Sequence, residues 1–153
     1  MDVRLLIVDQ AEEYTLTVRE HLADAGPGWS VTHAPRPSDA HLVITEAAFD
    51  AALVVLGSED QETLDLLDAL RHHQPDCVRL VLADVHTLER AHQLVSVCHR
   101  VLVSPCEPLS LQMAVEHTRR LQETLGRTGM RALGLRRRFR DSRHPTGDLL
   151  SSE

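Results

Sequence analysis

Five short runs of residues, separated by amphipathic segments, constrain the fold of this chain more than any other feature of its sequence. Most of the runs consist of consecutive Val, Leu, Ile and Ala residues, which is typical of strands that are buried on both faces of a parallel sheet. The second run alternates between apolar and polar residues, as a less buried strand does. We predict strands over residues 3–8, 29–34, 50–56, 78–83 and 99–103.

The segments between the runs have the spacing of helices. Apolar residues recur there every three or four positions among charged ones. We predict helices over residues 11–24, 37–48, 58–73, 87–97 and 108–125. Five strands alternating with five helices predict an α/β fold with a doubly wound, five-stranded parallel sheet. The strand order expected for a sheet of this size is 2-1-3-4-5, with the functional crevice at the carboxyl ends of the strands.

Charge is unevenly distributed between the body of the chain and its C-terminal end. All 16 basic residues are arginine, and the net charge is −7. Residues 118–153 contain nine arginines and four acidic residues, a net charge of +5, so residues 1–117 carry −12. We predict a domain over residues 1–126 and a basic extension over residues 127–153. Within the extension we expect a helix at 131–140 and disorder at 144–153.

The arginine cluster at residues 136–140 is compatible with binding to nucleic acid, to an acidic protein or to an anionic surface. It is equally typical of a solubilising tail or of a linker to an output domain. Aromatic side chains, which stack on bases, make up only 3% of the chain. We therefore favour a tail or linker over a nucleic-acid interface.

Several other classes of protein are disfavoured by the sequence. No apolar run approaches the roughly 20 residues that a membrane span needs, and the N-terminal residues do not resemble a signal peptide. Cys77, Cys98 and Cys106 are odd in number and lack C-x-x-C spacing, which argues against disulfides and a zinc site. We expect a cytoplasmic protein with no membrane partner, no metal and no cofactor.

Three stretches at the predicted strands resemble the receiver domain of bacterial response regulators. They are residues 5–9 (LLIVD), 78–82 (VRLVL) and 99–109 (HRVLVSPCEPL), and the resemblance extends over residues 3–125. The last stretch is similar to the H-R-F-L-x-K-P-C-D-P-x-x-L pattern of receivers that precede HD-related output domains. The resemblance implies a flavodoxin-like (CheY-like) fold and a role in two-component phosphorelay signalling.

The resemblance also implies where a phosphoryl group would be received. A working receiver has two acidic residues after the first strand and an acceptor aspartate after the third, which together hold Mg²⁺. It has a Ser or Thr after the fourth strand and a Lys before a proline after the fifth, because metal and ammonium neutralise the charge of the transferred group. The corresponding residues of this chain are Asp9, Gln10, Val55, Ala83, Ser104 and Pro105.

In this set Asp9 and Pro105 match the residue types of a receiver, whereas the second acid, the acceptor, the hydroxyl residue and the lysine are replaced, and the chain has no lysine at all. We therefore predict a degenerate pseudo-receiver that is not an enzyme. Asp9 then caps the first helix instead of holding a cation. The bond between Ser104 and Pro105 is expected to be cis, as the resemblance implies.

With the phosphorylation switch absent, the first hypothesis is a module that binds a signalling protein or a second copy of itself. In the family, the face formed by the fourth helix, fifth strand and fifth helix commonly mediates such contacts. The residues that we expect on this face are Leu88, His92, Ser96, Arg100, Val101, Leu102, Leu109 and Gln112.

Two other hypotheses remain open from the sequence. The chain could be a phosphoacceptor that uses a non-standard acid, Asp60 or Asp84. The absence of a lysine and of a hydroxyl residue at position 83 argues against this. It could also bind nucleic acid through the arginine-rich extension, in which case the affinity would depend steeply on salt.

Overall fold

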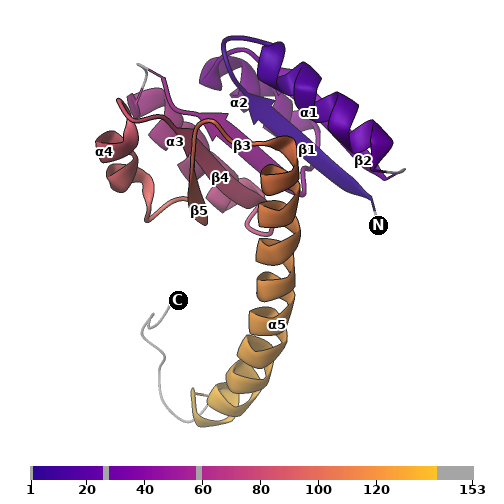
Figure 1. The fold of residues 1–153 in the computed structure, drawn as a ribbon. Helices are drawn as coiled ribbons and strands as arrows, with labels where there is room; N and C mark the ends of the chain where they lie inside the picture. Colours follow the sequence, from indigo (N-terminus) through magenta and orange to yellow (C-terminus); the bar gives the residue numbers. More distant parts are fainter. Residues whose placement is uncertain (1, 26–27, 58–59, 141–153) are drawn as a thin grey trace. The chain divides into compact units, whose positions relative to one another are not determined.

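A computed structural model describes residues 2–25, 28–57 and 60–140, with the side chains of residues 60 and 126–140 excepted. Within these residues the chain forms one five-stranded parallel sheet with helices between the strands (Figure 1). The strands are β1 (Val3–Val8), β2 (Trp29–Ala34), β3 (Ala51–Val55), β4 (Val78–Ala83) and β5 (Arg100–Val103). The helices are α1 (Glu13–Asp24), α2 (Pro37–Glu46), α3 (Asp60–His73), α4 (Leu88–Ala91), the 3₁₀ turn η1 (His92–Leu94) and α5 (Pro108–Arg140). The strand order is β2-β1-β3-β4-β5, so the predicted doubly wound fold is confirmed.

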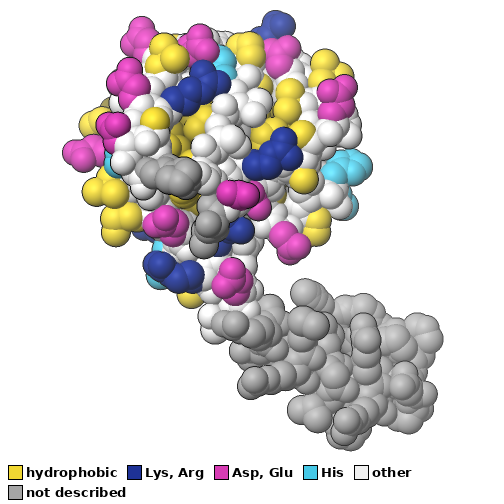
Figure 2. All heavy atoms as spheres, turned by 90° about the vertical axis from the view of Figure 1, so that its right-hand side faces the viewer, with side chains coloured by type: hydrophobic (Ala, Val, Ile, Leu, Met, Phe, Trp, Pro, Cys, Tyr) yellow, Lys and Arg dark blue, Asp and Glu magenta, His cyan; other side chains and the backbone are white. Residues whose placement is uncertain are grey.

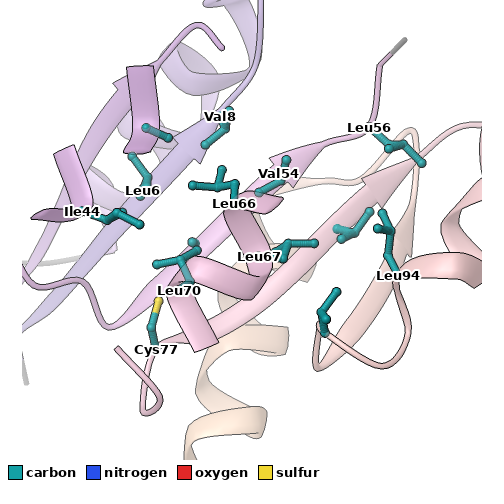
Figure 3. Close-up of a cluster of buried hydrophobic side chains, with 14 of the residues drawn as sticks. Leu6, Val8, Ile44, Val54, Leu56, Leu66, Leu67, Leu70, Cys77 and Leu94 are labelled. Carbon is teal, nitrogen blue, oxygen red and sulfur yellow. The ribbon is translucent and has the colours of Figure 1, made fainter. Parts of the chain in front are cut away.

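The sheet separates two apolar cores. Because successive side chains of a strand point to opposite faces, Leu6 and Val8 of β1 enter one core, while Leu5 and Ile7 enter the other. The first core packs the sheet against α2, α3, α4 and η1 (Figure 3). The second packs it against α1 and the first turns of α5. Burial on both faces explains why the central strands are continuously apolar in the sequence.

The fourth helix is shorter than predicted. Only Leu88–Ala91 is α-helical, and a single 3₁₀ turn, His92–Leu94, follows it. The predicted helix over residues 87–97 is therefore wrong in its second half. The carbonyl of Val97 instead accepts a 2.9 Å hydrogen bond from Nε of Arg79, and β-branched Val95 and Val97 have low helix propensity. The chain thus leaves the helix early and turns toward β5.

The second helix also ends before the predicted residue 48. Ala47 is already extended, at φ −140° and ψ 146°. The side chain of Gln74 donates to the carbonyl oxygens of Ile44 and Ala47, at 2.9 and 2.8 Å. A glutamine from the end of another helix therefore satisfies backbone groups that a helix end leaves unpaired.

The chain divides into two compact units, residues 1–118 and 119–153. The described part of the second unit, residues 119–140, is the C-terminal part of α5. The domain boundary predicted at residue 126 stays a prediction. The disorder predicted for residues 144–153 lies outside the described residues.

None of the helices in the described parts of the chain is long and apolar enough to cross a membrane.

Candidate functional site

A small pocket lies where β1 and β3 end, at the carboxyl edge of the sheet. Val8 of β1 pairs with Val54 of β3, so the next residues along the two strands, Asp9 and Val55, lie at the same edge of the sheet. The pocket has a volume of about 70 Å³, enough for a few water molecules and too small for a large cofactor. The described residues that line it are Val8, Asp9, Gln10, Pro35, Pro37, Val55, Gly57 and Thr63.

This pocket contains half of the predicted site. The structure brings together Asp9, Gln10 and Val55, as expected for strand ends that meet at one edge of a sheet. Ala83, Ser104 and Pro105 follow β4 and β5 and are not among the described lining residues. Thr63 of α3 was not among the predicted site residues, but its side chain is buried and contributes to the wall of the pocket.

Asp9 is held in place by its backbone and by a neighbouring histidine. Its amide donates to the carbonyl of Ala34 at 3.0 Å, and its own carbonyl lies 2.7 Å from Nε2 of His33. The carboxylate Oδ1 accepts from the amide of Ala11 at 3.3 Å. Burial raises the pKa of Asp9, and the Ala11 amide and the nearby His33 offset part of that rise. His33 is a residue of this site that sequence reasoning missed, since nothing in its run marked it.

The prediction that Asp9 caps the first helix is wrong. Helix α1 begins at Glu13, its N-cap residue is Glu12, and no side chain caps it. The bond from Ala11 to the Asp9 carboxylate closes a local turn two residues after Asp9, before the helix starts. The carboxylate therefore fixes the path of the chain out of β1.

The described residues at the end of β3 and just after it, Val55 to Gly57, have neither carboxylate nor hydroxyl side chains. Val55 is half-buried, and its side chain packs against the second apolar core. In the following loop, the carbonyl of Gly57 accepts a 2.6 Å hydrogen bond from Nη2 of Arg90. The guanidinium of Arg90 thus binds backbone in the loop after the position where a receiver carries its acceptor.

Asp84, one of the two proposed non-standard acceptors, closes the turn that precedes α4. Its Oδ1 accepts from the amides of His86 and Thr87 at 2.8 and 2.9 Å and from the Thr87 hydroxyl at 3.1 Å. The Thr87 hydroxyl in turn accepts from the Asp84 amide at 2.9 Å, so the two residues bind each other reciprocally across the turn. The His86 amide and the Thr87 groups lower the pKa of Asp84. A carboxylate with these three donors is a weaker nucleophile than a free one. The side chain of Asp60, the other candidate acceptor, is not among those that the structure describes.

The loop after β5 has the predicted cis bond between Ser104 and Pro105. The Ser104 amide donates to the carbonyl of Ala83 at 2.7 Å, which continues the pairing of β4 and β5 by one residue. Cys106 in this loop lies beside Tyr14 of α1, and burial together with this thiol raises the pKa of Tyr14. Ser104 itself is exposed and carries no positive charge.

The residues at this edge do not fit a Mg²⁺ site of the receiver type. Asp9 is the one carboxylate among the described residues that line the pocket. Over the described part of the chain, no three His, Cys, Asp or Glu side chains are grouped closely enough to hold a metal ion. Magnesium binds hard oxygen ligands and is held in proteins by carboxylates together with water or phosphate. One carboxylate beside an amide, a hydroxyl and aliphatic walls is a poor match.

A second candidate site is the face formed by α4, β5 and the first turns of α5. Large apolar side chains are exposed in these elements and in the turns before and after α4 and η1. They are Val85, Leu88, Val95, Val103, Leu109 and Met113. We call this set the apolar face. Four of its six residues were missed in the sequence, which does not show whether an apolar residue of a strand or helix points to the core or to the surface.

The residues predicted for this face are distributed between surface and interior. Leu88, His92, Ser96, Arg100 and Leu109 are exposed. Val101 and Leu102 are half-buried and pack against the two different cores. The Gln112 side chain is directed toward α1, where its Oε1 lies 2.8 Å from Nε2 of His21.

No family model and no curated protein sequence matches this chain. Solved structures do. A chain of the adenylate cyclase from Rhodopirellula baltica is 21% identical, with a TM-score of 0.71 over 88% of this chain and 98% of its own. A CheY-like response regulator receiver domain from Methanospirillum hungatei is 20% identical, with a TM-score of 0.70 over 81% and 98%. The chemotaxis response regulator CheY4 of Vibrio cholerae is 21% identical, with a TM-score of 0.65 over 76% and 98%. The chain therefore has the fold of response-regulator receiver domains.

Proposed function

We propose that this chain is a receiver-like module of bacterial two-component signalling that acts in the cytoplasm through protein–protein contacts and without receiving a phosphoryl group. Its fold supports the first part of the proposal. The observation that carries the second part is Val55 at the carboxyl end of β3, beside Asp9 in the pocket. An aliphatic side chain there has no oxygen to which phosphorus can bond.

The charges at the carboxyl edge of the sheet also support the proposal that the chain does not receive a phosphoryl group. Phosphoryl transfer needs positive charge placed around the transferred group. The chain has no lysine, and Ser104 stands where the resemblance implies one. The guanidinium of Arg90 is bonded to the Gly57 carbonyl. Receipt of a phosphoryl group would therefore lack both the acceptor and the ammonium group of a receiver.

The apolar face supports a role in binding. Single exposed apolar residues are common on protein surfaces, whereas apolar residues gathered in one patch mark interaction sites. The proposal takes the six exposed residues of α4, β5, α5 and the turns beside α4 as such a patch. In this proposal the occupant is a signalling protein, and binding is constitutive or controlled by that partner. Self-association through the same face is the competing outcome that the experiments must separate.

The absence of a phosphoryl site is tested by amide NMR of the full chain during titration with Mg²⁺ and then with beryllofluoride, a phosphoryl mimic. We expect no saturable shifts at Asp9, Val55, Ala83 or Ser104 in a well-dispersed spectrum. Saturable shifts confined to these residues at millimolar or lower concentration contradict the proposal. Incubation with acetyl phosphate followed by intact-mass analysis is the parallel chemical test, with an unmodified mass expected.

The apolar face is tested with a photo-crosslinking residue at Val95 or Val103, introduced in living cells of the source bacterium. Leu42, exposed on α2, is the matched control position. A discrete crosslinked protein seen from Val95 and Val103 but not from Leu42, and lost on Leu109→Asp, supports the assignment. Crosslinks of the chain only to itself identify a homodimer. If all three positions give the same crosslinked products, the apolar face is not the binding site.

A further inference from the structure

The pocket at the carboxyl edge of the sheet combines aliphatic walls with one carboxylate. The walls come from Val8, Pro35, Pro37 and Val55. Asp9 is the one ionisable residue among the described residues that line the pocket. The proline nitrogens carry no hydrogen, so this part of the wall has no backbone donor for an anion. Space of about 70 Å³ between such walls suits a ligand that is aliphatic along its length and positive at its tip.

The carboxylate of Asp9 is only partly neutralised by the described residues around it. The backbone amides of Gln10 and Ala11 act on it, and the second lies 3.3 Å from Oδ1, longer than usual for such a bond. His33 is the one ionisable side chain whose charge acts on it, but Nε2 of that ring is engaged at 2.7 Å with the Asp9 carbonyl. None of the ion pairs between described residues includes Asp9. A half-buried carboxylate in this state is stabilised by a ligand that brings a positive charge.

The polar groups of the pocket favour an ammonium group over a guanidinium. An ammonium group has three N–H donors and no planar geometry to satisfy. Besides the Asp9 carboxylate, the Thr63 hydroxyl and the Gln10 side-chain amide offer acceptors at the same pocket. An arginine binds best with its planar fork on both oxygens of a carboxylate. Oδ1 of Asp9 already accepts from the Ala11 amide, so a compact ammonium group is the better match.

The charge of the domain also suits a positive ligand. Residues 1–117 carry a net charge of −12, and acidic side chains are spread over the face of the domain drawn in Figure 2. A negative body raises the local concentration of cations and repels anions. None of the 153 residues is a lysine, so none of them can supply the side-chain ammonium itself. An exposed lysine of a protein partner can supply it.

We propose that the pocket binds the side chain of a lysine from a partner protein, with the ammonium beside the Asp9 carboxylate and the methylenes between the aliphatic walls. The inference rests on the proposed function in taking the partner to be a protein. It adds the residue type by which that partner is recognised. It also gives the carboxyl edge of the sheet a role in docking that needs neither metal nor phosphoryl group.

The first test is amide NMR of the full chain during titration with n-butylammonium chloride, which has the methylenes and the ammonium of a lysine side chain. n-Butanol is the neutral control, and sodium chloride controls for ionic strength. We expect saturable shifts of the amides of Asp9, Gln10, Gly57 and Thr63 with butylammonium, and none with either control. Because this comparison uses the native chain, it does not depend on whether a variant folds.

A charge-removing variant identifies the group that binds. Asp9→Asn keeps an acceptor for the Ala11 amide but loses the negative charge, and we expect it to weaken butylammonium binding at least about tenfold. Asp24→Asn, exposed at the end of α1, is the matched control and is expected to bind as the native chain does. Unchanged amide shifts for the strands away from the pocket show that each variant is folded.

Two further ligands distinguish a lysine on a polypeptide from a free amine. The peptide acetyl-Gly-Lys-Gly-amide carries the side chain on a backbone, and the same peptide with acetyl-lysine is its uncharged control. Cadaverine represents the free amine. We expect the lysine peptide to shift the same four amides as butylammonium and the acetyl-lysine peptide to shift none of them.

Three results overturn the proposal. One is equal shifts with butylammonium and butanol, which makes the pocket merely apolar. Another is the absence of saturable shifts with butylammonium. The third is binding of cadaverine without binding of the lysine peptide, which makes the pocket a site for a free amine.

These outcomes are separable from those of crosslinking at the apolar face. A crosslinked partner at Val95 together with no butylammonium binding supports the proposed function and overturns this inference. Binding of the lysine peptide that is lost in Asp9→Asn, with no crosslinked partner at Val95, supports the pocket and removes the apolar face from the proposed function.

Discussion

Arg90 in α4 and Gly57 in the loop after β3 are joined by a 2.6 Å hydrogen bond from the guanidinium Nη2 to the carbonyl oxygen. The bond joins α4, the shortest of the described α-helices, to the loop beside the pocket. Because α4 has only one turn of α-helix, side-chain contacts of this kind must fix its position. The relationship yields a prediction about stability.

Arg90→Met removes the donor and keeps the length of the side chain. We expect it to lower the free energy of unfolding by about 1–2 kcal/mol, since Arg90 is partly exposed and a hydrogen bond from a charged donor is worth about 1.5–3 kcal/mol. Urea unfolding measures the change, and amide shifts of residues 57 and 88–91 locate it. Arg100→Met, exposed on β5, is the control. Equal losses from both variants would mean that the bond does not hold α4.

Gln74 is predicted to matter more than a glutamine at the end of a helix ordinarily does. Its amide group donates to Ile44 and Ala47, and its Oε1 accepts from the amide of Phe49 at 2.7 Å. Gln74→Leu would leave these backbone groups without their partner at a half-buried site. We expect a loss of about 2–4 kcal/mol in urea unfolding. Gln93→Leu, exposed on η1, should change stability by less than about 0.5 kcal/mol. A loss no greater for Gln74 than for Gln93 would refute the role.

The stability of the domain is predicted to fall in mild acid because of His99. Its Nδ1 accepts a 2.9 Å hydrogen bond from the Arg79 amide, a role that only the neutral ring can fill. Burial and the Arg79 charge lower the pKa of His99 below its ordinary value of 6.5. The unfolded chain therefore takes up this proton at higher pH than the folded chain, so stability is lost as the pH falls through 6.5.

Urea midpoints between about pH 8 and pH 5.5 measure this dependence. We expect His99→Gln, which keeps an acceptor but cannot be protonated, to have a flatter profile than the native chain. His73→Gln, at the exposed end of α3, controls for the loss of a histidine. If the profile of His99→Gln is as steep as the native one, another group is responsible.

The sequence predicted the strands well and the connections less well, for a physical reason. A strand buried on both faces must be apolar along its length, so β3 and β4 are visible in the sequence alone. The early end of the fourth helix depends on Arg79 binding the Val97 carbonyl, a contact across 18 residues. The role of Gln74 depends on contacts across 25 to 30 residues. Neither contact leaves a local pattern.

For the candidate site, too, the sequence predicted some features and not others. The register of β1 with β3 placed Asp9, Gln10 and Val55 together, as the parallel sheet required. Position alone could not show that Asp9 would bond to the Ala11 amide or lie beside His33. Sequence position identified the residues, whereas their partners came from loops whose paths are set by packing.

The last prediction concerns what it takes to restore a receiver. Val55→Asp alone supplies an acceptor but neither a second acid nor an ammonium group, so we expect no phosphorylation by acetyl phosphate. Val55→Asp combined with Gln10→Asp, Ala83→Thr and Ser104→Lys supplies metal ligands, hydroxyl and counter-charge together. We expect this fourfold variant to gain the mass of one phosphoryl group in the presence of Mg²⁺. The triple variant that keeps Ser104 is the matched control and should gain little, because the transferred charge is then incompletely neutralised. If Val55→Asp alone is phosphorylated, the pocket retains the electrostatics of a receiver, and only the acceptor has been lost.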